Sequence, residues 1–431
     1  MLKASLSLFM ALFLSSAPVA AVLGLLAILL VTFYSPLPLI RALGEISWAT
    51  SNDFLLVAVP LYILMGEILL RSGIAGRIYE AMAKWLTWLP GGLMHSNIGV
   101  SAIFAATSGS SVVTAATVGT VALPVAEKFR YNQRLFLGSI AAGGTLGILI
   151  PPSINMLIYG FITDTSVPQL YLAALIPAAI LCALFMATIA IACIRNPHWG
   201  GEKQHVSWAE RFSGLPHLVP PLLLFLLVVG SIYAGWATPT ESAALGVIGA
   251  MILAAANRTL SVAMLKTAIE NTMRVTGMAM LILLGAFFLN FVLSTLGISR
   301  DILAFFDEIR TQFDLSPMQV MIALVIMYLI MGCFMDPMAM MVMTVPIVAP
   351  LVASLGYDLI WFGILMVVLS ETGMITPPFG INVFVVQAVR GKGPLLDVMI
   401  GALPFVAALL VLTALLLVWP SLALWLPGSF G

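Results

Sequence analysis

Two stretches of the sequence place helix-breaking residues in the middle of long apolar segments. Gly147 to Asn155 reads GILIPPSIN, and Gly373 to Asn382, about half the chain later, reads GMITPPFGIN. A proline inside a helix removes a backbone N–H donor and biases the residue before it away from helical angles. The carbonyl groups left without partners suit a bare cation, and the N–H groups that open the next helical segment suit an anion. The chemistry predicted at these stretches is therefore ion binding.

Two other apolar segments, 91–126 and 317–353, are too long for one membrane-crossing helix and are also broken in the middle. The first breaks at TSGSS, Thr107 to Ser111, and the second breaks near Gly332 and again at Asp336-Pro337. Non-helical backbone at membrane depth is tolerated only where protein buries it or where it lines a polar cavity. Interrupted segments in matching positions of two halves are typical of a transporter binding site.

Hydroxyl groups accompany the freed carbonyls. Sodium prefers hard oxygen ligands, which Ser108, Ser110, Ser111 and Thr376 could add. Ser110 and Ser153 lie at the two breaks of the first half and are candidates for substrate contact. No Arg or Lys falls inside a predicted spanning core, so an anionic substrate would be held by backbone dipoles, hydroxyls and bound cations. One sodium ion in each half would make the pocket positive only when loaded, so that the anion binds well only after sodium.

Several amide and acidic residues are further candidates. Asn155 and Asn382 end the matching breaks, which favours contact with substrate or cation over helix capping. Asp336 precedes a proline, so it either contacts substrate or caps a helix. Glu371 is an acid at predicted membrane depth, where an ionisable group is a functional candidate. Glu67 is expected to be structural.

The composition places the whole chain in a membrane. Of 431 residues 61% are hydrophobic and 8% are charged, whereas a soluble protein has about a quarter of its residues charged. Zero net charge argues against a nucleic-acid partner. The three cysteines lie in apolar runs without paired spacing, which argues against disulfides and zinc. The sequence has no HExxH motif, no Walker A loop and no histidine placed to activate a serine, so an enzyme is not expected.

Apolar runs of about 20 residues can cross the hydrocarbon core. They lie near 4–33, 54–70, 135–163, 169–194, 215–235, 239–257, 275–296, 359–389 and 395–420. The first follows Lys3 and continues to Phe33, and is expected to be a retained transmembrane helix rather than a cleaved signal.

Basic residues give the predicted topology. Arg71, Arg77 and Lys84 precede segment 91–126, and Lys128, Arg130 and Arg134 follow it. Both flanks are then cytoplasmic by the positive-inside rule, so this segment is a re-entrant hairpin. Continued alternation leaves only Arg41, Arg300 and Arg310 of the 18 basic residues outside. The N-terminus is then cytoplasmic and the C-terminus periplasmic.

The second hairpin, 317–353, has mainly acidic flanks and is expected to open to the outside. The halves are therefore inverted repeats, 1–213 and 239–431, joined by a linking helix in 214–238. Each includes a hairpin and a broken helix: 91–126 with 135–163, and 317–353 with 359–389. Segments 72–89 and 297–314 alternate apolar and charged residues at helical spacing and are predicted to be amphipathic helices in the interface, serving as support or as braces for a moving core.

The chain resembles a known family. MGEILLRSGIAGR, TSGSS, GTLGILIPPSI followed by IYG, MGCFMDPMAMMVMTVPI and ETGMITPPFGINVFVV are similar to motifs of the large membrane subunit of tripartite ATP-independent periplasmic (TRAP) transporters. The resemblance implies an all-α polytopic protein of the bacterial inner membrane that works as an elevator-type transporter. It also implies a separate small four-helix membrane subunit, a periplasmic substrate-binding protein and an organic-acid (carboxylate) substrate.

The resemblance further implies two sodium sites. Their ligands would be Ser108, Ser111, Gly147, Ile150 and Pro152 at the first site, and Gly332, Gly373, Thr376 and Phe379 at the second. Most would act through backbone carbonyls. Ile150 in the first stretch corresponds to Thr376 in the second, so the two sites should not be equivalent.

Two other functions remain open from the sequence. A sodium-coupled carboxylate symporter acting alone would use the same inverted halves and breaks. An ion channel could also use re-entrant loops, although channels usually assemble several subunits around an axis.

Overall fold

The computed structural model describes residues 7–8, 11–12, 17–202 and 206–430. This part of the chain is helical and contains no strand, which confirms the predicted all-α class. The predicted first helix, 4–33, is represented by α2 (Val19–Tyr34). Lys3 and much of the segment before α2 lie outside the described residues.

The helices follow the order expected from the breaks. The first half contains α2, α3 (Ala42–Ser51), α4 (Ala58–Arg71), α5 (Ile74–Leu86), α6 (Leu93–Ser108), α7 (Ser111–Lys128), α8 (Gln133–Leu149), α9 (Ile154–Thr163) and α10 (Val167–Arg195). The connection contains α11 (Trp208–Gly214) and α12 (Val219–Tyr233). The second half contains α13 (Pro239–Ala256), α14 (Val262–Thr295), α15 (Ile298–Gln312), α16 (Pro317–Gly332), α17 (Pro337–Ser354), α18 (Leu359–Ile375), α19 (Ile381–Arg390), α20 (Leu395–Val418) and α21 (Ser421–Phe430).

Both predicted hairpins are present. α6 and α7 form the first, and their outer ends meet where the Leu93 backbone N–H donates to the Tyr131 hydroxyl at 3.1 Å. α16 and α17 form the second, and the Tyr328 hydroxyl of α16 donates to Thr344 Oγ1 of α17 at 2.9 Å. The tips fall at the serine-glycine run and at the segment before Pro337, as the sequence predicted.

Both predicted broken helices are present. α8 ends at Leu149 and α9 begins at Ile154, whereas α18 ends at Ile375 and α19 begins at Ile381. The peptide bond between the two prolines is cis in each break. Carbonyls four residues before a proline have no N–H to accept from, so each pair of prolines ends its helix.

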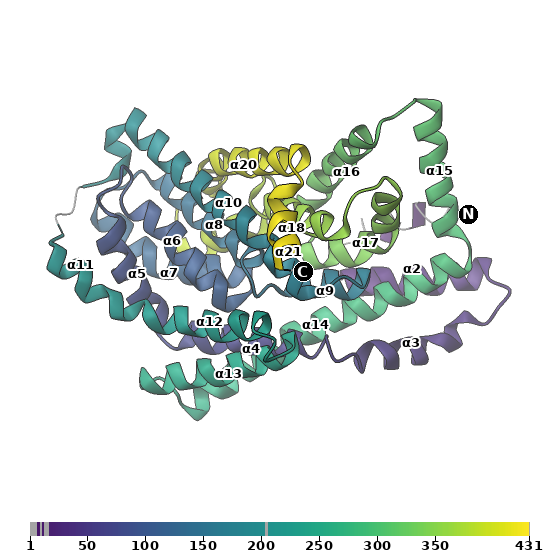
Figure 1. The fold of residues 1–431 in the computed structure, drawn as a ribbon, viewed down its shortest axis with the longest axis horizontal. Coiled ribbons are helices and arrows are strands. Elements are labelled where there is room, and N and C mark those ends of the chain that lie inside the picture. The colour runs from purple at the N-terminus through teal and green to yellow at the C-terminus, as the bar shows by residue number, and fades with distance from the viewer. Residues whose placement is uncertain (1–6, 9–10, 13–16, 203–205, 431) are drawn as a thin grey trace.

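The molecule has two layers, visible in Figure 1. The lower layer, called the frame here, consists of α2, α3, α4, α12, α13 and α14; in it α2 packs on α14 and α13 on α4. The upper layer, the core, consists of both hairpins, both broken helices, α10, α20 and α21. α5 and α15 lie towards opposite ends of the molecule, and each follows a left-handed glycine, Gly73 (φ 70°) or Gly297 (φ 76°).

The two halves interlock inside the core. α9 of the first half packs against α17 and α18 of the second. α19 of the second half packs in turn against α7 and α8 of the first. Each post-break helix therefore lies on the other half's hairpin and broken helix. The repeat boundaries themselves, 1–213 and 239–431, stay a prediction.

The helices that could cross a membrane differ in part from the predicted spans. In the described chain, six helical segments are long and apolar enough to cross a membrane, or up to eight when each sharply bent helix pair counts as one span. α2, α16 and α18 are apolar but shorter. α14 runs much further towards its N-terminus than the predicted 275–296, through a polar stretch containing a Lys266–Glu270 pair one helical turn apart. α3 had no counterpart in the sequence prediction.

Candidate functional site

The first predicted cation site lies where the tip of the α6–α7 hairpin touches the end of α8. A Cβ placed on Gly147 would lie 2.5 Å from the Ser110 carbonyl oxygen. Gly109, at the tip with φ 60°, faces Pro152, whose carbonyl oxygen would lie 2.8 Å from a Cβ there. The backbone of the tip and the backbone of the break thus meet without intervening side chains.

Oxygen atoms at this first junction are left available by the local hydrogen bonding. The Gly147 carbonyl has Pro151 as its fourth following residue, so it lacks the helical N–H partner. The Thr114 hydroxyl donates to the Ser110 carbonyl at 2.8 Å. Ser108 Oγ, 2.9 Å from Thr114 Oγ1, must then be the donor in that pair. Its lone pairs remain free to bind a cation.

The second predicted site has the same construction. A Cβ on Gly373 would lie 2.5 Å from both the carbonyl carbon and oxygen of Gly332 at the end of α16. The Gly373 carbonyl has Pro377 as its fourth following residue, which cannot donate to it; it accepts from the Thr376 N–H at 3.3 Å and keeps one lone pair. The Thr376 hydroxyl donates to the Thr372 carbonyl at 2.5 Å, which leaves the lone pairs of Thr376 Oγ1 available.

The two junctions differ in exposure. Ser108 and Ser111 at the first are buried, at 3% and 1% exposed. Phe379 at the second is 52% exposed, and its ring centroid lies 5.4 Å from that of Phe334 on the hairpin tip. Ile150 and Thr376 are each partly buried at their break. The second junction is therefore the more accessible of the two.

A cavity of about 260 Å³ lies between the core and the frame. Its core side is lined by both hairpin tips, the first broken helix and Met374 of the second, and its frame side by α4 and α14. The lining residues are Ile63, Gly66, Glu67, Ser108, Gly109, Ser110, Ser111, Val112, Val113, Ile148, Ile154, Asn155, Val275, Met278, Asp336, Pro337, Met338 and Met374. Of the predicted substrate contacts, Ser110, Asn155 and Asp336 are in this lining, whereas Ser153 and Asn382 are not.

Three helix N-termini, those of α7, α9 and α17, reach the cavity. Ser110 caps α7 by accepting from the Val113 N–H at 3.5 Å, and Ser153 caps α9 by accepting from the Met156 N–H at 3.4 Å. Asn155, 7% exposed, is in the first turn of α9, and its Nδ2 has no hydrogen-bond partner among the described residues. The lining contains no Arg or Lys. Positive potential at this surface therefore comes from helix dipoles and amide N–H groups, which suits an anionic group.

Both acids in the lining already have partners. Asp336 Oδ2 accepts from the backbone N–H groups of Met338 (3.0 Å) and Ala339 (3.4 Å), so Asp336 caps α17. Glu67 pairs with Arg71 one turn away, and Glu67 Oε2 accepts from Asn271 Nδ2 of α14 at 3.3 Å. These contacts offset the negative charge that would otherwise repel an anion.

The sequence did not indicate that Glu67 faces the site. Its position beside the basic Arg71 suggested a purely structural role, yet the structure places it in the cavity wall. An acid inside an apolar run was the available signal. The neighbouring Gly66 lets the frame approach the hairpin, because a Cβ there would lie 3.0 Å from the Ser108 carbonyl oxygen.

Glu371 lies outside the cavity lining. Its side chain is fully buried in α18, and neither carboxyl oxygen has a hydrogen-bond partner among the described residues. Across the same residues no group of three His, Cys, Asp or Glu side chains could hold a metal ion.

The sequence matches a known family over nearly its whole length. Residues 6–422 match the family described as "Tripartite ATP-independent periplasmic transporter, DctM component". The C4-dicarboxylate TRAP transporter large permease protein DctM of Pseudomonas aeruginosa is 34% identical over 410 residues, covering 95% of this chain and 94% of that protein.

Other relatives have different named substrates. The ectoine TRAP transporter large permease protein of Halomonas elongata is 31% identical, with 86% of each chain covered. The sialic acid TRAP transporter large permease protein of Vibrio cholerae is 28% identical, with 88% of this chain and 87% of that protein covered.

Solved structures show the same fold at low identity. The YdaH transporter of Alcanivorax borkumensis has a TM-score of 0.61 and 14% identity, covering 98% of this chain and 99% of its own. MtrF of Neisseria gonorrhoeae has a TM-score of 0.58 and 12% identity, covering 92% and 85%.

Proposed function

Because the chain belongs to the DctM family of tripartite ATP-independent periplasmic transporters, we propose that it is the large subunit of a sodium-coupled carboxylate importer. It is a multi-pass membrane protein and a transport subunit rather than an enzyme. Beyond membership of this family, the proposal names the driving ion, the class of substrate and the motion that carries the substrate across the membrane.

The cavity between core and frame is the observation that carries the proposal. The N-termini of α7 and α9 open onto it, and the unpartnered Nδ2 of Asn155 lies in its wall. A carboxylate at this surface accepts from N–H groups without needing a basic side chain. The relatives named for C4-dicarboxylates and sialic acid support an organic-acid substrate.

Sodium occupies the two junctions between hairpin tip and broken helix. Each junction offers a glycine carbonyl with a free lone pair, because a proline takes the place of its fourth-residue N–H donor, and each offers hydroxyl oxygens with free lone pairs. Bound sodium adds positive charge beside the anion and so raises its affinity. Each net positive charge carried inward gains about 2.3 kcal/mol at a potential of 100 mV.

Transport proceeds by sliding of the core against the frame. The cavity is bounded by the core on one side and by α4 and α14 on the other, so movement of the core carries the bound ions and substrate past a fixed wall. The expected partners are a separate small membrane subunit and a periplasmic substrate-binding protein, with the chain in the bacterial inner membrane, its N-terminus cytoplasmic and its C-terminus periplasmic.

Reconstituted uptake tests the proposal. Proteoliposomes containing both membrane subunits are expected to accumulate the carboxylate only with an inward sodium gradient and with the loaded binding protein outside. A potassium gradient of equal size is the matched control. Equal uptake with potassium would contradict sodium coupling, and undiminished uptake without the binding protein would favour a symporter that acts alone.

Thr376→Ala is expected to raise the sodium concentration for half-maximal uptake by about tenfold, the cost of one contact to a charged group. The reason is that Thr376 Oγ1, already a donor to Thr372, has its lone pairs free for the ion. Thr376→Ser keeps the hydroxyl and should retain the normal sodium dependence. An unchanged sodium dependence in Thr376→Ala would remove this residue from the second site.

A further inference from the structure

We propose that Asn382 is a positioning residue of the first sodium site and that, through α19, it links the occupancy of the two sites. This role rests on the proposed sodium coupling. It gives Asn382 a function different from that of Asn155, which occupies the matching position in the first half. The evidence is the contacts at both ends of α19.

The Asn382 side chain is fully buried, and its amide nitrogen donates hydrogen bonds to residues of the first half of the chain. Asn382 Nδ2 donates to Ser111 Oγ at 2.7 Å and to the Ala141 carbonyl of α8 at 3.3 Å. Nδ2 fits close to Gly144, where a Cβ would lie 3.0 Å from it. An amide has two N–H donors, and both are therefore used.

This contact orients a predicted sodium ligand. Ser111 Oγ accepts one hydrogen bond from the buried Asn382, which positions the oxygen and restricts its proton and remaining lone pair to the two other directions. A cation ligand whose orientation is fixed before binding costs less to order when the ion arrives. Asn382 therefore acts on sodium through Ser111 without touching the ion.

The same helix starts at the second site. α19 begins at Ile381, directly after the break that contains Thr376 and Phe379. Because α19 is a continuous helix from Ile381 to Arg390, a shift of the break on sodium binding is transmitted to Asn382 in its first turn. Sodium at the second site thereby acts on Ser111 at the first.

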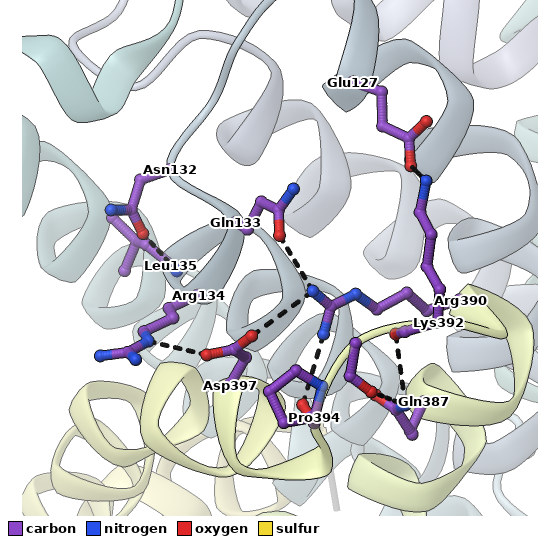
Figure 2. Close-up of polar contacts among 11 residues, drawn as sticks. Glu127, Asn132, Gln133, Arg134, Leu135, Gln387, Arg390, Lys392, Pro394 and Asp397 are labelled. Carbon is purple, nitrogen blue, oxygen red and sulfur yellow. Dashed lines mark hydrogen bonds and ion pairs between the residues drawn. The ribbon is translucent and has the colours of Figure 1, made fainter.

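The C-terminal end of α19 also contacts first-half helices (Figure 2). Arg390 Nη2 donates to Gln133 Oε1 of α8 at 2.9 Å, and it lies 3.4 Å from Asp397 Oδ2. Just beyond the helix, Lys392 Nζ pairs with Glu127 Oε1 of α7 at 2.6 Å. With contacts to first-half helices at both ends, α19 is placed to transmit a displacement of the second break to the first hairpin, as coupling between two sites requires a physical connection.

In the described part of the chain, the corresponding asparagine of the first half, Asn155, makes no equivalent contact with the second half. Its Nδ2 has no partner among the described residues and lies in the cavity wall. We therefore assign Asn155 to substrate contact and Asn382 to the first ion site.

Sodium-dependent thermal stabilisation of the purified full-length chain, without substrate, tests the proposal. Sodium replaces choline at constant ionic strength, and melting is followed for the wild type, Asn382→Leu and Asn290→Leu, a control that makes the same change in the frame helix α14 outside the cavity lining. Leucine keeps the approximate volume and removes the donor. Asn382→Leu is expected to raise the half-saturating sodium concentration about tenfold and to bring the Hill coefficient close to one. Asn290→Leu should keep the wild-type sodium curve.

A double-mutant cycle keeps the test informative if Asn382→Leu is poorly folded. Ser111→Ala is expected to weaken sodium binding, and the double variant should be no worse than the more affected single variant, because both changes remove one contact. Full additivity, or a wild-type sodium curve in Asn382→Leu, would overturn the role of Asn382 alone. If the wild type shows no sodium-specific stabilisation, the proposed sodium coupling itself is wrong and this role falls with it.

Discussion

Gly373→Ala is expected to abolish sodium-driven uptake, with a loss of at least about a hundredfold. The added Cβ would lie 2.5 Å from the carbonyl carbon and oxygen of Gly332. Both atoms belong to backbone, so no flexible side chain can yield, and the hairpin tip must withdraw from the break. A misplacement of about 1 Å in a site that depends on geometry costs about a hundredfold. Uptake in proteoliposomes measures the effect.

Gly277→Ala is the matched control for this variant. Gly277 lies inside α14, and a Cβ there would meet no atom within 4 Å. Its uptake should equal that of the wild type. Normal sodium-driven uptake by correctly inserted Gly373→Ala would show that the close approach of α16 and α18 is unnecessary for transport, and it would remove the second junction as an ion site.

Gly401→Ala is expected to have the largest effect on folding. α8 and α20 cross where Gly138 faces Gly401, and a Cβ on Gly401 would overlap the Arg134 carbonyl oxygen. Overpacking of a core usually costs 1 to 3 kcal/mol, and a backbone-to-backbone crossing should reach about 3 kcal/mol or more. The yield of monodisperse protein and its melting temperature should both fall sharply.

Gly230→Ala on α12 makes the same chemical change in open space, because no atom lies within 4 Å of its Cβ position. The higher helix propensity of alanine should leave stability unchanged or slightly raised, by up to about 1 kcal/mol. If Gly401→Ala melts like the wild type, the α8–α20 crossing is looser than the structure indicates.

The positions of the breaks could be predicted from the sequence because their cause is covalent. Pro151 and Pro377 cannot donate to Gly147 and Gly373 in any fold, so the helices end where the prolines require. The hairpins could also be predicted, since the run Ser108 to Ser111 and the pair Asp336-Pro337 interrupt helices locally. The structure adds that these local breaks face each other across junctions made of glycine.

Features set by tertiary packing could not be predicted. α3 carries Glu45 and Trp48 in a short polar segment that becomes helical while packed on α14. Asn382 and Asn155 occupy matching positions in sequence, which suggested one shared role. Only the packing of α19 on α7 and α8 turns Asn382 towards Ser111, and nothing in the local sequence signals that contact.

Site residues named from the family resemblance gain a physical reason from the structure, without being tested by it. Gly147, Gly332 and Gly373 stand where two backbones approach closely, and a side chain there would separate the carbonyl groups. For Glu67 the interpretation of the sequence was incomplete. Its pairing with Arg71 favoured a structural role, but Glu67 also lies in the cavity wall. Its partner Asn271 is far away in sequence, so this arrangement required the folded frame.

The most direct test of the central claim is a count of sodium ions bound by the purified chain at equilibrium, with radioactive sodium. The two junctions predict saturable, sodium-specific binding that approaches two ions per chain, that potassium does not displace, and that falls to one in Gly373→Ala. Absence of saturable sodium binding in the wild type, or two ions still bound after both Gly147 and Gly373 are changed to alanine, would contradict the assignment of these junctions as the ion sites.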